Sequence, residues 1–139
     1  MSMWRNLTAA SLAATAVAAG AVAMAAPASA AVYGGQCGAG YSVVDSTGIR
    51  DLGTVFLTYN PGNGSNCAVT IRNEDAPSGS VSVYIGPCGG PVRTVTVNGG
   101  RSAGPVYATV SGQEINWGGA IDGPVRRLPC GVSGAATAA

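Results

Sequence analysis

The sequence predicts a single small all-β domain, an antiparallel sandwich or barrel of about seven strands. Short segments of alternating apolar and polar residues recur between turn-forming residues, and this alternation is typical of strands with one buried face. Outside the first 30 residues no segment shows a helical period longer than one turn, and the abundant glycine and β-branched residues disfavour helices. Four cysteines in so short a chain predict two disulfides that cross-link the domain.

The first half of this domain contains three expected strands, at 41–45, 54–59 and 67–72. The second of them alternates Val55, Leu57 and Tyr59 with threonine and phenylalanine on its other face. The loop after it is rich in asparagine, proline and glycine, which end strands, so the second and third strands are expected to form a hairpin. The two faces of the third strand are Cys67, Val69 and Ile71, and Ala68, Thr70 and Arg72.

The second half contains four more expected strands, at 81–85, 92–98, 106–110 and 114–117. One face of the first is Val81, Val83 and Ile85, and one face of the third is Val106, Ala108 and Val110. In the second, Val95 and Val97 are expected to point inward. Turns are expected at 86–90, at Asn98-Gly99 and at Ser111-Gly112, and Gly118-Gly119 is expected to end the last strand.

The first 30 residues are typical of an export signal. Arg5 gives a positive start, residues 7–24 are uncharged and apolar, and Ala28-Ser29-Ala30 places small residues where a signal peptidase cuts. Removal of this signal peptide, 1–30, would leave 31–130 as a secreted β domain and 131–139 as a flexible C-terminal tail. The start of the domain is also expected to be loose. We therefore expect a secreted, extracellular protein with no membrane anchor after cleavage.

The four cysteines are Cys37, Cys67, Cys88 and Cys130, all in the part expected to be exported. They allow three pairings, of which we favour Cys37–Cys67 with Cys88–Cys130. Each loop closed in this way would contribute about 3–4 kcal/mol in the chain-entropy model. Because the chain has no C-x-x-C spacing and no histidine, we expect no metal site.

Charge and composition exclude several function classes. The chain has 7 basic residues, all arginine, against 6 acids, and only Arg126 and Arg127 are adjacent, so we expect no nucleic-acid partner. It has neither histidine nor lysine, which removes the usual general base and the usual activators of a nucleophile. We therefore expect no catalytic residue, no cofactor and no enzymatic activity.

Two pairs of acidic residues are candidates for the two carboxylates of a glycoside hydrolase. Glu74 and Asp75 lie in a loop with proline and glycine, and we expect them to be solvated. Glu114 and Asp122 flank Trp117 and could face one pocket, but we expect an exposed strand residue and a turn residue instead. Replacing either by its amide is expected to change stability little.

Three aromatic residues are candidates to face a ligand: Tyr84, Tyr107 and Trp117. The two tyrosines lie opposite the inward valine rows, where they could stack on sugar rings or cover a loop or sheet edge, whereas Trp117 is more typical of a core. An exposed aromatic row would indicate a carbohydrate- or cell-wall-binding module. A third possibility is a small secreted protease inhibitor, for which only the loop 86–90 around Cys88 qualifies, although its glycines make it too flexible.

Five stretches of sequence carry a family resemblance: Gly34–Asp45, Gly53–Asn60, Asn66–Thr70, Ala103–Tyr107 and Ile115–Gly119. Their order and spacing resemble the spore-associated protein A family, small secreted proteins of filamentous, spore-forming soil bacteria. In that family a cysteine precedes the Ile-x-Trp-Gly-Gly stretch; here Glu114 stands there and Cys88 appears instead, which leaves the partner of Cys88 open. The resemblance implies a non-enzymatic structural protein of sporulation, bound to a spore or cell-wall surface. It implies no substrate, cofactor or active-site residue.

Overall fold

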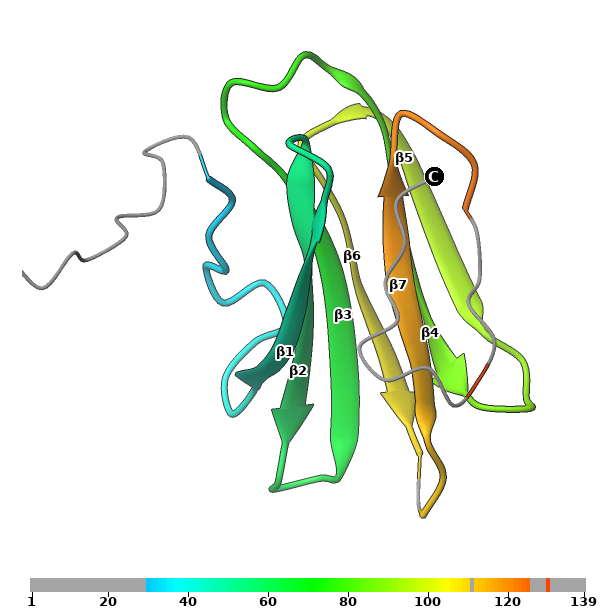
Figure 1. The fold of residues 1–139 in the computed structure, drawn as a ribbon. Coiled ribbons are helices and arrows are strands. Elements are labelled where there is room, and N and C mark those ends of the chain that lie inside the picture. Colours follow the sequence, from blue (N-terminus) through cyan, green and yellow to red (C-terminus); the bar gives the residue numbers. More distant parts are fainter. Residues whose placement is uncertain (1–29, 111, 126–129, 131–139) are drawn as a thin grey trace, which may run out of the picture.

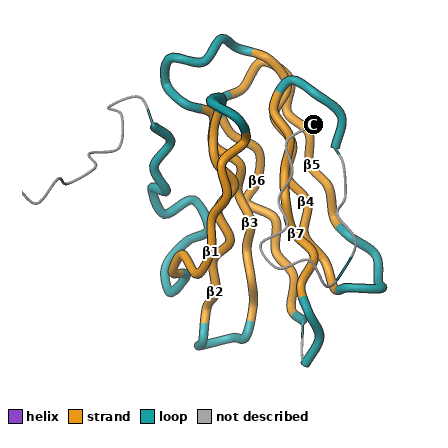
Figure 2. Tube along the Cα trace, viewed as in Figure 1, coloured by secondary structure: helices purple, strands orange, loops and turns teal. Residues whose placement is uncertain are grey.

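The computed structural model describes residues 30–110, 112–125 and 130, which form two β-sheets packed face to face (Figures 1 and 2). The described residues contain no helix. The seven strands are β1 (Ser42–Ile49), β2 (Gly53–Asn60), β3 (Ser65–Arg72), β4 (Gly79–Pro87), β5 (Arg93–Gly100), β6 (Ser102–Thr109) and β7 (Ile115–Ile121). The expected all-β class, strand number and antiparallel pairing are confirmed, and the architecture is a sandwich.

One sheet has four strands in the order β1-β2-β3-β6, and the other has three in the order β5-β4-β7 (Figure 1). The chain builds three neighbouring strands of the first sheet, crosses to the second with β4 and β5, returns with β6 and crosses again with β7. The expected hairpin between β2 and β3 is present, with Asn60 paired to Ser65.

The core lies between the two sheets. It forms because each sheet turns one apolar face inward, as the alternation along the strands dictates. Its buried members are Ile49, Val55, Leu57, Ala68, Val81, Val83, Ile85, Ala103, Val106, Trp117 and Ile121.

The last strand is longer than the sequence predicts. Gly118 and Gly119 do not end it; they pair with Tyr84 and Val83 of β4, and the strand continues to Ile121. Glycine is needed there because of close packing. A Cβ on Gly119 would lie 2.2 Å from the hydroxyl of Thr70 and 2.5 Å from the carbonyl oxygen of Ser82.

We therefore predict that Gly119→Ala destabilises the domain by about 1–3 kcal/mol, because the added methyl group has no space between the sheets. Gly48→Ala is the matched control, since its Cβ would meet nothing closer than 3.9 Å. Urea unfolding of both variants measures the difference. Equal stabilities would show that the sandwich can open locally to admit the methyl group.

The segment 31–41 lies along the outer face of the four-stranded sheet, at the start of the coloured trace in Figure 1. The Cys37–Cys67 disulfide joins it to β3, and the ring of Tyr33 packs on Phe56 of β2 at a centroid distance of 6.0 Å. The backbone N–H of Ala31 donates to Oδ1 of Asn73 at 3.0 Å. These contacts correct the expectation of a loose start to the domain.

The expected signal peptide, apart from its last residue, lies outside the described residues, as does the expected tail 131–139. Among the residues that are described, no helix has the length and apolar character needed to cross a membrane.

Candidate functional site

The structure separates the three candidate ligand-facing aromatic residues. Trp117 is only 3% exposed and points into the core from β7, and Tyr84 on β4 is fully buried. Tyr84 does lie on the outer face of its sheet, as the alternation predicts. Its hydroxyl packs closely over Gly118, since a Cβ on Gly118 would lie only 2.6 Å from the hydroxyl oxygen. The interpretation of these two residues as ligand-facing is therefore wrong, because each is covered by its own domain.

Tyr107 is the candidate that remains accessible, with 37% of its surface exposed. It lies on β6 opposite Cys67, on the outer face of the four-stranded sheet. Its hydroxyl donates to the carbonyl oxygen of Cys37 at 2.9 Å, and the ring of Tyr41 meets its ring edge-on at 5.6 Å. The side chain is thus held in place by the segment that the first disulfide attaches.

Tyr107 also lines a pocket of about 400 Å³ where the end of β6 passes the end of β4 and the start of β5. The lining residues are Ile85, Gly86, Pro87, Pro91, Arg93, Tyr107, Ala108 and Thr109. Apart from Tyr107, none of these residues is predicted from the sequence to contact a ligand. No periodic pattern could reveal them, because they come from three strands and a turn that are brought together only by the packing of one sheet on the other.

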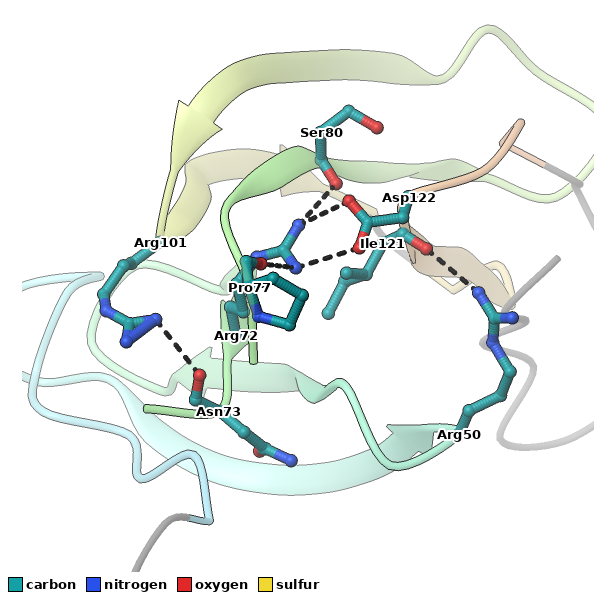
Figure 3. Close-up of polar contacts among 8 residues, drawn as sticks. All are labelled: Arg50, Arg72, Asn73, Pro77, Ser80, Arg101, Ile121 and Asp122. Carbon is teal, nitrogen blue, oxygen red and sulfur yellow. Dashed lines mark hydrogen bonds and ion pairs between the residues drawn. The ribbon is translucent and has the colours of Figure 1, made fainter. Parts of the chain in front are cut away.

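A second polar cluster surrounds Arg72, the last residue of β3, whose side chain is fully buried (Figure 3). Its two terminal nitrogens donate to both carboxylate oxygens of Asp122, at 2.7 and 3.0 Å. The same nitrogens donate to the carbonyl oxygens of Pro77 and of Ser80. One guanidinium therefore connects the end of β3, the loop before β4, the start of β4 and the end of β7.

Asp122 lies in the turn after β7, as predicted, but its carboxylate is also paired with Arg72. The hydrogen bonds between Arg72 and Asp122 lower the pKa of Asp122 below the ordinary value of an aspartate. The same bonds raise the pKa of Arg72 above the ordinary value of an arginine. The expectation that an amide at this position changes stability little rested on a solvated carboxylate, and the structure removes that basis. The Arg72–Asp122 pair requires glycine at position 79, because a Cβ there would lie 1.8 Å from Oδ1 of Asp122.

Two further arginines hold the same end of the sandwich together. Arg50 donates to the carbonyl oxygen of Ile121 at 3.2 Å, and Arg101 donates to that of Asn73 at 3.1 Å (Figure 3). The side chain of Asn73 in turn donates to the carbonyl oxygen of Asp51 at 2.8 Å. Because every acceptor except Asp122 is a backbone carbonyl, we assign this cluster to loop anchoring.

The structure does not bring the candidate acid pairs together as a catalytic site. Glu114 and Asp122 lie at opposite ends of β7, and Asp122 is occupied by Arg72. Glu74 and Asp75 are exposed in the loop between β3 and β4. Within the described part of the chain, no three residues of histidine, cysteine, aspartate or glutamate gather as metal ligands would.

The structure contains both favoured disulfides, Cys37–Cys67 and Cys88–Cys130. The first joins segment 31–41 to the outer face of β3. The second ties the turn after β4, where the N–H of Cys88 donates to the carbonyl oxygen of Glu114 at 2.8 Å. The partner of Cys88, which the sequence left open, is therefore Cys130.

Comparison with known proteins gives one informative relative. The chain is 43% identical over 92 residues to spore-associated protein A of Streptomyces coelicolor. This chain is therefore similar to a spore-associated protein A. The matched part is 66% of this chain and 60% of the relative, so the chain spans about three fifths of that protein's length.

No family model matches the sequence, and no solved structure matches the fold. The resemblance in the five short stretches and the 43% identity point to the same relative.

Proposed function

We propose that this chain is an exported, non-catalytic structural protein that associates with the surface of spores or cells. The observation that carries this proposal is the 43% identity to a protein named for its association with spores. The amino-terminal segment typical of an export signal and the two disulfides are both consistent with a protein that works outside the cytoplasm.

The surface of the domain suits adhesion. The formal net charge of the whole chain is only +1, so repulsion between copies or from a charged surface is weak. Val43 and Val44, at the bulge in β1, are 43% and 57% exposed, and Tyr59 near the end of β2 is 37% exposed. These residues offer apolar area at the open edge of the four-stranded sheet.

A wall-binding module is the second candidate, and the pocket beside Tyr107 is the observation that favours it. The inhibitor alternative loses its support. Gly86 and Pro87 pair with Asn116 and Ile115 of β7, so only the turn 88–90 is left as an inhibitory loop, and its Cys88 is held by a disulfide.

The proposal predicts that a tagged form of the protein stays on spores after washing with water and leaves them with detergent or high salt. Immunoblots of the washes measure this, with an unrelated exported protein of similar size as the control. Val43→Ser/Val44→Ser should reduce retention while the melting temperature stays the same, and Val32→Ser, an exposed valine on segment 31–41, should not. Protein found only in the medium would contradict the proposal.

A further inference from the structure

The domain holds the chain at Ala31, the residue that follows the expected cleavage site. The backbone nitrogen of Ala31 donates to Oδ1 of Asn73 at 3.0 Å. Cleavage before Ala31 would turn this peptide nitrogen into an α-ammonium group, which carries three donors and a positive charge at neutral pH. The atom that binds Asn73 would then be the first atom of the mature protein.

The side chain of Asn73 is held in the orientation that this group needs. Its Nδ2 donates to the carbonyl oxygen of Asp51 at 2.8 Å, which turns Oδ1 toward Ala31. Its backbone N–H donates to the carbonyl oxygen of Leu52 at 2.8 Å, and its own carbonyl oxygen accepts from Arg101 at 3.1 Å (Figure 3). A flipped amide would place two donors against each other at Ala31. Little ordering is therefore needed when the ammonium binds.

The charges around Asn73 favour a cation. Three exposed acids lie on the two loops that Asn73 connects: Asp51, Glu74 and Asp75. None of the three forms an ion pair within the part of the chain that the structure describes. The opposing charge is Arg101, whose guanidinium is bound to the carbonyl oxygens of Asn73 and Glu74. A hydrogen bond from an ammonium is also about twice as strong as one from a neutral amide.

The bond at Ala31 is the first attachment of segment 31–41, which covers part of the four-stranded sheet. Two residues later the ring of Tyr33 packs on Phe56, and its hydroxyl accepts from the N–H of Cys37 at 3.2 Å. The covalent attachment follows at Cys37, which is bonded to β3. Chain ends are where proteolysis concentrates, so the bond at Ala31 guards the start of this segment.

We propose that Asn73 and its two loops form a binding site for the α-ammonium of the processed amino terminus, and that this site protects the terminus from aminopeptidases. The ammonium of Ala31 donates to Oδ1 of Asn73. An aminopeptidase must draw the free end into its own active site, so this bond has to open before the first residue can be removed. Cleavage before Ala31 rests on the proposed export of the chain, whereas the recognition of the terminus by Asn73 does not.

The test digests oxidised protein that begins at Ala31 with a non-specific aminopeptidase and follows its amino terminus by mass spectrometry. Asn73→Ala should lose Ala31 at least about tenfold faster than the natural protein, because no charge-assisted hydrogen bond opposes opening of the terminus. Asn66→Ala is the matched control and should be trimmed at the natural rate. The side chain of Asn66 also donates to a backbone carbonyl, that of Thr58 at 3.1 Å, but it does not bind Ala31.

Urea unfolding separates this site from a general loss of stability. Deleting Ala31 should raise the unfolding equilibrium constant several-fold in the natural protein and much less in Asn73→Ala, which has no such bond left to lose. Retaining Ala30 should also raise it, because the nitrogen of Ala31 then keeps an N–H but carries no charge.

Three results would overturn the proposal: equal trimming of the natural protein and Asn73→Ala, equal stability of chains that begin at Ala30 and at Ala31, or an exported protein whose first residue is not Ala31. A protein whose terminus is protected through Asn73 but which does not stay on spores would refute the proposed function alone. A protein that stays on spores although both forms are trimmed equally would refute the amino-terminal site alone.

Discussion

Replacing Cys67 with serine is expected to destabilise the domain by about 2–5 kcal/mol. The Cys37–Cys67 bridge closes a loop with a sequence separation of 30 residues, and its loss returns that conformational freedom to the unfolded chain. Cys67 is also fully buried on the outer face of β3. Without the bond, segment 31–41 loses its covalent attachment, so Val69 and the partly buried Phe56 would become more exposed to water.

Urea unfolding of the oxidised protein measures this effect, and Cys37→Ser should have the same effect because it breaks the same bond. Mass spectrometry of the exported protein should show the loss of four hydrogens relative to the reduced chain. Four free thiols, or a melting temperature that does not change under a reductant, would contradict the prediction.

The second large effect is expected from Asp122→Asn. The substitution leaves the buried guanidinium of Arg72 without its counter-charge and replaces one accepting oxygen by a donating amide. We expect the melting temperature to fall by about 10 °C. The double variant Arg72→Met/Asp122→Asn should be more stable than Asp122→Asn alone, since it no longer buries an unpaired charge.

Acid provides an independent measurement of the same pair. Because folding lowers the pKa of Asp122, its stabilising effect is complete above the pKa of the unfolded state and is lost as the pH falls through the folded-state value. The difference in urea midpoint between the natural protein and Asp122→Asn should therefore shrink below about pH 4. Glu114→Gln, at the exposed start of β7, is the matched control. A constant difference from pH 6 to pH 2 would show that the pair does not carry the effect.

The alternation of residues predicts where strands form but not what covers their outer faces. Val55, Leu57, Val81 and Val83 follow the two-residue period and lie in the core as expected. Tyr84 follows the same period to the outer face and is nevertheless buried. The period reports only which of two faces a residue occupies, and covering the second face depends on segments far away in the sequence.

β3 illustrates the same limit on the other sheet. Both of its faces are largely buried: Ala68 and Thr70 face the core, and on the outer face Val69 is buried and Cys67 is bonded to segment 31–41. Its charged end, Arg72, faces inward because Asp122, 50 residues later, supplies the counter-charge. A pattern of neighbouring residues cannot predict a pair that lies 50 residues apart in the sequence. The pocket beside Tyr107 could not be predicted from the sequence for the same reason, because its lining residues come from separate strands.

The two disulfide loops follow one another along the chain, 37 to 67 and then 88 to 130, without interleaving. A polypeptide that is translocated amino-terminus first delivers Cys37 and Cys67 to the oxidising side while Cys88 and Cys130 are still behind. Oxidation in order of emergence then yields the native pairs directly, because the third thiol is absent when the first pair closes. A chain with interleaved bridges would form wrong pairs first and would depend on an isomerase to rearrange them. For a chain exported as proposed above, the layout of these four cysteines therefore favours the native pairs without catalysed disulfide exchange.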